Sequence, residues 1–366
     1  MSLPLPTVRP DAVEHYAEIL DNETLPSEAL CLTAVRGVSV EQALVRFDAV
    51  GSGRAATLDA VGLASVNAFP DELPLVVAGE RDGWVILAEN NGFQGAQPQV
   101  LSRLSEGTVA ASVYWNVNLD NAIGLAHDGE ALAEFDFVTG AGVPAPELAP
   151  FLAELDFEDA ELMCAAALAC LERVSGVRLD AHWASTPHIA SAIVPSERFA
   201  LPSAAAWLSA NTPEVYQAVP DADRRLLREV ATIAATRACA AAGVTDPHVL
   251  GCLAHDVEAL PREATQRAYD VLTMLARGEY GQALSLRWDR CGPDGGDRDR
   301  DARLHADTTE ERALTARAHA IAAVRSRYAR DPADAVAQTV VNTCHAGRAQ
   351  WNDTRRELAL RLTERP

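Results

Sequence analysis

The chain has 366 residues, 48% of them apolar, and its 52 acidic and 31 basic residues give a net charge of -21. This apolar content is enough for folded cores and excludes global disorder. No stretch approaches the roughly 18 consecutive apolar residues that a membrane span needs, and the length predicts two or three domains.

The acidic residues are concentrated in the first part of the chain. Residues 1–200 contain 29 acidic residues and 9 arginines, whereas residues 201–366 contain 23 and 22. Every basic residue is arginine, and the chain has no lysine. The acidic part disfavours nucleic-acid binding because it repels phosphates, and its long-range field favours a basic protein or peptide as partner. General solubility is the simpler interpretation of the same charge.

Local signals in the first 50 residues predict helices around one buried strand. Residues 11–20 have helical spacing, with Asp11 as the expected N-cap. The apolar run 29–37 predicts a strand that ends at Gly37. Ser39 and Gln42 have the spacing of a capping box and predict a short helix after it.

Residues 73–137 form the clearest β region. Two pairs of apolar runs are joined at Asp-Gly dipeptides, residues 82–83 and 128–129, and such dipeptides are strong hairpin signals. A short helix over 98–107 and a strand over 108–118 lie between the hairpins. This order predicts an α+β fold, a mostly antiparallel sheet with helices on one face.

From about residue 146 the apolar spacing becomes helical. A long helix is expected over 158–176, and prolines at 187, 195 and 202 then indicate a linker or an edge strand. The expected organisation is therefore an acidic α+β domain over 1–185, a linker over 186–202 and an all-helical domain over 203–366. The helical domain is expected to contain a mobile, charged loop at 292–303. Its expected helices are 203–210, 212–219, 221–243, 246–258, 261–277, 279–288, 308–330, 332–346 and 349–364.

Motifs for catalysis, metals and cofactors do not occur in the sequence. It has no Gly-x-Ser-x-Gly, Cys-x-x-Cys, His-Glu-x-x-His or Gly-x-Gly-x-x-Gly pattern. A chain without lysine cannot use a Walker lysine or a Schiff-base lysine. Cys252 and His255 share a predicted helix face, but without a second pair they do not make a metal site. We therefore predict no catalytic residue, metal or cofactor.

The cysteines and the N-terminal segment bear on localisation. Seven scattered cysteines indicate buried free thiols in a reducing compartment. The first 20 residues lack the pattern of a secretory signal. Both observations predict a cytoplasmic protein.

Polar and aromatic residues gather near the ends of the predicted strands. Asn and Gly at such positions favour turns, whereas Trp, Phe and Asn together also suit a recognition surface. The candidate binding residues are Trp84, Glu89, Asn90, Asn91, Phe93, Trp115, Asn116, Asn118 and His127.

The order of the motifs resembles a known family. Cys-Leu-Thr-x-Val-Arg-Gly at 31–37 is followed by Gly-Trp at 83–84 and Glu-x-Asn-Gly-x-Gln-Gly at 89–95. Leu-Ser-x-Gly at 104–107, Val-Tyr-x-Asn-Val-Asn at 113–118 and the Asp-Gly hairpin come next, and the helix at 169–179 completes the match. These features, over about residues 12–180, resemble an uncharacterised family of small α+β proteins of high-GC bacteria. The resemblance implies a fold and no activity.

Three functions remain open. The first is a non-enzymatic protein- or peptide-binding protein with an immunity-like or regulatory role, which the acidic first part favours. The second is an enzyme or small-molecule-binding protein of a biosynthetic pathway, with Glu89, Asn116, Asn118 and His127 lining a pocket near the ends of the sheet. The third is a helical adaptor with an apolar groove between helices 221–277 and 308–346.

Overall fold

The computed structural model describes residues 3–140, 145–195, 198–292 and 308–363. The chain divides into two compact units. Unit 1 comprises residues 1–193 and 288–305, and unit 2 comprises residues 194–287 and 306–366.

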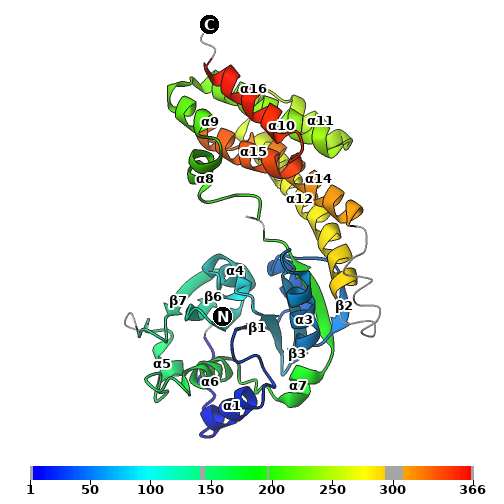
Figure 1. Ribbon diagram of the computed structural model, residues 1–366. Helices are drawn as coiled ribbons and strands as arrows, with labels where there is room; N and C mark the ends of the chain where they lie inside the picture. The colour runs from blue at the N-terminus through cyan, green and yellow to red at the C-terminus, as the bar shows by residue number, and fades with distance from the viewer. Residues whose placement is uncertain (1–2, 141–144, 196–197, 293–307, 364–366) are drawn as a thin grey trace. The chain divides into compact units, whose positions relative to one another are not determined.

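An eight-stranded sheet organises unit 1 (Figure 1). Its strands are β1 (Leu30–Arg36), β2 (Ala49–Ala56), β3 (Leu75–Arg81), β4 (Trp84–Asn90), β5 (Val109–Trp115), β6 (Asn121–His127), β7 (Glu130–Phe135) and β8 (His188–Ile193). They lie in the order β2-β8-β3-β4-β1-β5-β6-β7, and every pairing is antiparallel. The predicted α+β class is confirmed.

Helices cover the sheet of unit 1. They are α1 (Ala12–Asp21), α2 (Val40–Arg46), α3 (Leu58–Ala68), η1 (Gln94–Ala96), α4 (Pro98–Leu104), α5 (Ala149–Leu152), α6 (Met163–Ser175) and α7 (Ala181–Ser185). One face of the sheet carries the core cluster in which Leu87 packs with side chains of α2 and α4. Successive side chains of a strand point to opposite faces, and Asn90 on the other face lies against Gly62 of α3. Helices therefore cover both faces of the sheet, whereas we predicted helices on one face only.

The capping box and the two hairpin turns that the sequence predicts are present in the structure. Ser39 accepts the N–H of Gln42 while the Gln42 side chain accepts the N–H of Ser39, so the capping box is complete. Asp82 and Gly83 both have positive φ, 53° and 77°, which is the backbone of a type I′ hairpin turn. Asp128 and Gly129 repeat this geometry in the β6–β7 hairpin.

The predicted linker at 186–202 is corrected by the structure. His188–Ile193 is strand β8, which lies inside the sheet between β2 and β3. Its sequence, between two prolines, was compatible with an edge strand, but its partners lie more than 100 residues earlier in the chain. The boundary between the units falls after Ile193, and a second segment of unit 1 begins at Trp288.

Unit 2 is helical, as predicted. Its helices are α8 (Ala204–Asn211), α9 (Pro213–Ala218), η2 (Val219–Asp221), α10 (Arg224–Ala242), α11 (Pro247–Ala254), η3 (Val257–Ala259), α12 (Arg262–Cys291), α14 (Thr309–Ser326), α15 (Pro332–Ala346) and α16 (Trp351–Thr363). Helix α12 is continuous where we predicted a break at Gly278, because a helix tolerates glycine at a modest cost. The predicted mobile loop at 292–303 lies outside the described residues, apart from Gly292.

The last turns of α12 lie against the β2 side of unit 1. Arg54 of β2 forms an ion pair with Asp289 at 2.7 Å, and its guanidinium lies 3.6 Å from the ring centre of Trp288. Asn67 of α3 donates a hydrogen bond to the carbonyl of Cys291 at 3.0 Å. The end of α12 therefore lies beside β2 and α3.

Arginine side chains satisfy the carbonyl groups at the ends of several helices. Arg46 donates to the carbonyls of Leu104 and Glu106 after α4. Arg327 in unit 2 donates to the carbonyls of Cys252, Leu253 and His255 at the end of α11. Helix C-termini carry unpaired carbonyls and a partial negative charge, so these cations stabilise the helix ends.

Candidate functional site

Seven of the nine candidate residues gather at one end of the sheet of unit 1. Leu30 of β1 pairs with Asn90 of β4 on one side and with Trp115 of β5 on the other. Glu89 is the next-to-last residue of β4, and the loop 91–97 follows directly on this strand. Asn116 begins the loop between β5 and β6. We call this region the sheet end.

Trp84 and His127 do not belong to the sheet end, which corrects the prediction. Trp84 pairs with Arg36 and His127 pairs with Val109, both at the opposite end of these strands. Six residues of strand separate the two ends, about 20 Å at a rise of 3.3 Å per residue. Sequence analysis grouped Trp84 and His127 with the other candidates because they flank the same strands. Trp84 is buried, and the Nε2 atom of His127 is buried without a hydrogen-bond partner among the described residues.

Glu89 is a buried carboxylate below the loop 91–97. Its Oε1 accepts the N–H of Gln94 at 3.1 Å, and its Oε2 accepts the N–H of Gly95 at 2.9 Å. Cys31, its cross-strand partner on β1, lies beside it. Burial raises the pKa of Glu89 to about 7, although the two N–H groups act in the opposite direction. Glu89 therefore holds the loop against the sheet.

The other residues of the Glu-x-Asn-Gly-x-Gln-Gly motif also have structural roles. Asn91 adopts a left-handed backbone with φ of 60°. A side chain at Gly92 would overlap the carboxylate of Glu89, and one at Gly95 would overlap Thr33 Oγ1. Gln94 donates a hydrogen bond to Asp48 at 3.2 Å. The motif thus describes a loop that packs closely on the sheet.

Asn90 and Trp115 also support the fold. Trp115 is buried, and its indole Nε1 donates to the carbonyl of Ser27 at 2.8 Å. The side chain of Asn90 packs against Gly62 of α3. Trp115 is therefore buried, and Asn90 is half-buried against α3.

Asn116 organises the loop between β5 and β6. Its Oδ1 accepts the N–H groups of Asn118 and Asp120, at 2.9 and 3.0 Å. Its Nδ2 donates to the hydroxyl of Tyr114 and to Oδ2 of Asp120, at 2.7 and 3.0 Å. The turn interpretation of this asparagine is confirmed, because all these bonds close the loop on itself.

The ordered loops leave apolar side chains in solvent at the sheet end. Val117 and Leu119 are 68% and 64% exposed, and Phe93 is 55% exposed. The Phe93 ring lies 6.2 Å from the ring of Tyr114, which binds Asn116. Exposed apolar residues held by a rigid scaffold are typical of contact surfaces. Sequence analysis found Phe93 but missed Val117 and Leu119, because it weighed the polar members of the loop.

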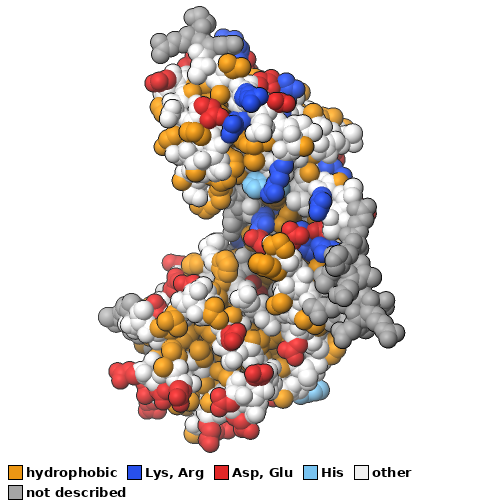
Figure 2. All heavy atoms as spheres, viewed as in Figure 1, with side chains coloured by type: hydrophobic (Ala, Val, Ile, Leu, Met, Phe, Trp, Pro, Cys, Tyr) orange, Lys and Arg blue, Asp and Glu red, His pale blue; other side chains and the backbone are white. Residues whose placement is uncertain are grey.

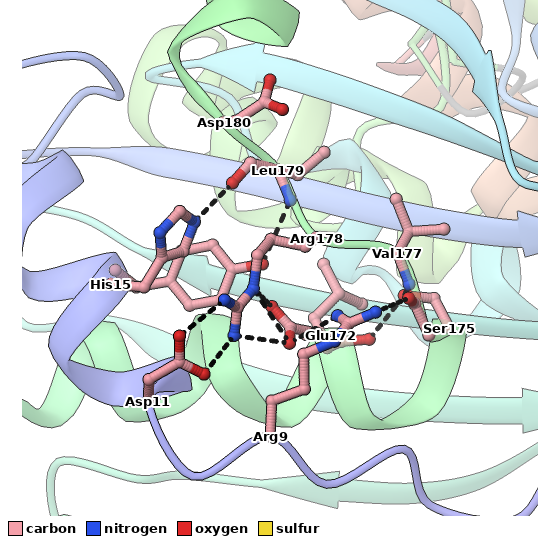
Figure 3. Close-up of polar contacts among 12 residues, drawn as sticks. Arg9, Asp11, His15, Glu172, Ser175, Val177, Arg178, Leu179 and Asp180 are labelled. Carbon is pink, nitrogen blue, oxygen red and sulfur yellow. Dashed lines mark hydrogen bonds and ion pairs between the residues drawn. The ribbon is translucent and has the colours of Figure 1, made fainter.

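A second polar cluster, which we did not predict, joins the N-terminal arm to the end of α6 (Figure 3). The fully buried carboxylate of Glu172 binds Arg9 at 2.7 Å and Arg178 at 3.1 Å. Arg178 also donates to both carboxylate oxygens of Asp11. His15 contacts the carbonyl of Leu179 at 2.8 Å. The charged side chains of this cluster pair with one another, so we assign the cluster a structural role.

Neither a cluster of metal-ligating side chains nor a long apolar helix occurs among the described residues. No group of three or more His, Cys, Asp or Glu side chains lies close enough to hold a metal ion. His255 is the C-cap residue that follows α11, and its Nδ1 contacts the hydroxyl of Tyr328 at 3.0 Å. In the part of the chain that the structure describes, no helix has the length and hydropathy of a membrane span.

Residues 12–199 match the model of a protein family, DUF6461, which is described as a family of unknown function. The chain belongs to this family. No curated protein and no solved structure matches the chain.

The DUF6461 match includes every strand of the sheet and the whole sheet end. It extends past the predicted limit near residue 180 and includes β8, whose place inside the sheet explains why the family region continues to that strand. Helices α8 to α16 follow the DUF6461 region.

Proposed function

We propose that this chain is a non-enzymatic binding protein and that unit 1 binds a basic protein or peptide. The observation that carries this proposal is a segment of one charge. Residues 104–172 contain thirteen acidic residues and no arginine or lysine. Strands β5, β6 and β7 belong to this segment, so a partner that contacts them meets acidic side chains and no cation from it.

Most of the described arginines of unit 1 make contacts within that unit. Ion pairs, stacking or helix-end carbonyls engage seven of them. These are Arg9, Arg46, Arg54, Arg81, Arg103, Arg173 and Arg178. Their ion pairs are with Asp11, Asp48, Glu172, Asp180 and Asp289, so they leave the exposed acids of residues 104–172 without a partner arginine from this set.

Eleven of the thirteen acids of residues 104–172 are exposed, whereas Asp136 is half-buried and Glu172 is buried. Glu14, Glu18 and Asp21 share one face of α1 and have no ion-pair partner among the described residues. Acidic side chains gather over the lower part of unit 1, around α1, α5 and α6 (Figure 2). This surface attracts a basic partner at long range.

The sheet end supplies apolar contacts beside this charge. Phe93, Val117 and Leu119 are exposed there, and Asp120 lies in the same loop. An apolar centre with a charged rim is the usual composition of a protein interface. The alternative pocket of Glu89, Asn116, Asn118 and His127 has less support, because Glu89 is buried and His127 lies at the far end of the sheet.

The experiment is a selection of binders from a displayed library of random peptides, using the full chain. We expect enrichment of basic peptides that also carry apolar residues. Their affinity should fall steeply as salt is added, because salt screens charge attraction. The triple variant F93S/V117S/L119S should weaken binding about tenfold, and the equally exposed control V45S/L63S/V66S should not. Peptides without basic residues, or an affinity that salt leaves unchanged, would contradict the proposal.

A further inference from the structure

The two edges of the sheet in unit 1 differ in how they are covered. The β2 edge lies beside the end of α12, through Arg54 with Trp288 and Asp289. The β7 edge is at the rim of unit 1 (Figure 1). Among the described residues β7 pairs only with β6, and no backbone hydrogen bond joins its outer edge. The outer N–H and C=O groups of β7 are therefore open to a further strand.

The side chains of β7 define which strand fits. Glu130 and Glu134 are exposed and have no ion-pair partner among the described residues. A second copy of this strand would place like charges opposite one another, which is unfavourable. A strand that carries arginine or lysine on the corresponding positions would instead meet opposite charge.

A small cavity lies beside the same strand. It has a volume of about 170 Å³ and a largely apolar lining. Residues of α4, β6 and β7 line it, among them Leu101, Gly124 and Glu134. A cavity of about 150 Å³ accommodates a group the size of benzene, so this one accepts an aliphatic side chain of a bound segment.

We propose that β7 is a docking edge at which an extended basic segment of a partner protein adds as a ninth strand. Backbone hydrogen bonds to β7 supply affinity. Glu134 beside the cavity and Glu130, which the register shift of β7 places on the opposite face, supply specificity. This inference rests on the proposed binding function and adds the place and the conformation of the bound segment.

The test uses the full chain and a synthetic peptide of alternating arginine and valine, with a second peptide in which proline replaces valine. Proline keeps the charge but cannot complete a strand ladder. We expect the valine peptide to bind and to protect the amides of residues 130–135 from hydrogen exchange. The proline peptide should bind about tenfold more weakly.

Charge-reversal variants locate the contact. E130R/E134R should weaken binding of the valine peptide about tenfold. E41R/E80R, which reverses two exposed acids that lie outside both α1 and residues 104–172, should bind as the unmodified chain does. Salt-sensitive binding with amide protection elsewhere, or equal binding of both peptides, would overturn the docking edge and leave the binding function standing. Absence of salt-sensitive binding would overturn both. Amide protection and dimer formation without peptide would show self-pairing of β7 and also overturn the inference.

Discussion

Glu89 and Cys31 face each other across strands β4 and β1, and both side chains are fully buried beneath the loop 91–97. The carboxylate has N–H donors and a thiol as neighbours. Burial also raises the pKa of the Cys31 thiol, and the adjacent carboxylate adds to this effect. The pair is a buried proton-binding element at the sheet end.

Protein stability should depend on the ionisation of Glu89. Its pKa is about 7 in the folded chain against 4.5 for an ordinary glutamate, so the folded state binds the proton more tightly. Its stabilising contribution is complete below pH 4.5, falls between pH 4.5 and 7, and is lost above pH 7. Relative to E89Q, the chain should lose about 2 kcal/mol of unfolding free energy between pH 5 and 7.5.

Urea unfolding at both pH values measures this difference. E80Q, at an exposed position of β3, serves as the control and should follow the unmodified chain. A stability difference between E89Q and the unmodified chain that stays constant with pH would refute the assignment.

Gly95→Ala tests how closely the loop 91–97 packs on the sheet. A Cβ at this position would overlap Thr33 Oγ1 and contact Cys31 and Phe47, so the loop must shift. We expect a loss of about 2 kcal/mol in unfolding free energy. Gly251→Ala in α11 is the matched control, because its Cβ would meet open space. It should be neutral or stabilise the chain by up to about 1 kcal/mol. Equal effects of both variants would contradict the packing argument.

Glu172→Ala tests the cluster between the N-terminal arm and α6. The change leaves Arg9 and Arg178 without their shared carboxylate in a partly buried site, and should cost about 3 kcal/mol. It should also expose the arm to proteolysis near residue 9. Glu357→Ala removes the carboxylate from an exposed pair with Arg237 and should cost less than about 1 kcal/mol. A protease-resistant arm in the first variant would show that the cluster is not what fixes it.

Arg327→Met tests the arginine at the end of α11. The buried guanidinium donates to three carbonyl groups and to the hydroxyl of Thr232. Methionine has a similar length but no donor, so we expect a loss of about 2 to 3 kcal/mol. Hydrogen exchange should also become faster in α11. Arg356→Met on the exposed face of α16 is the control and should be neutral. Unchanged exchange in α11 would rule out the capping role.

Local signals in the sequence predicted the local parts of the fold. The capping box at Ser39, the two Asp-Gly hairpins and the helical spacing of unit 2 each depend on a few neighbouring residues. The sequence did not reveal β2, whose glycines and serine weaken the strand signal, or the position of β8. That position depends on pairing between distant segments, which periodicity does not report.

The candidate site was only partly predicted, because the sequence shows local turns but not which distant residues lie together. The sequence located the loop of Phe93 and the loop of Asn116, because turn residues mark both. It could not separate Trp84 and His127 from them, since the two ends of one strand are close in sequence but about 20 Å apart in space. It also treated Glu89 as a surface residue, because burial of a carboxylate depends on the loop that folds over it.

The return of α12 to β2 makes unit 1 discontinuous in the chain. A fragment that stops at residue 199 contains all eight strands but lacks Trp288, Asp289 and Cys291. Arg54 would then lose its ion pair and its aromatic neighbour, and Asn67 would lose its acceptor. Both edge strands of such a fragment, β2 and β7, would then be exposed. Fragments could pair edge to edge, and this association would lower the solubility of the fragment.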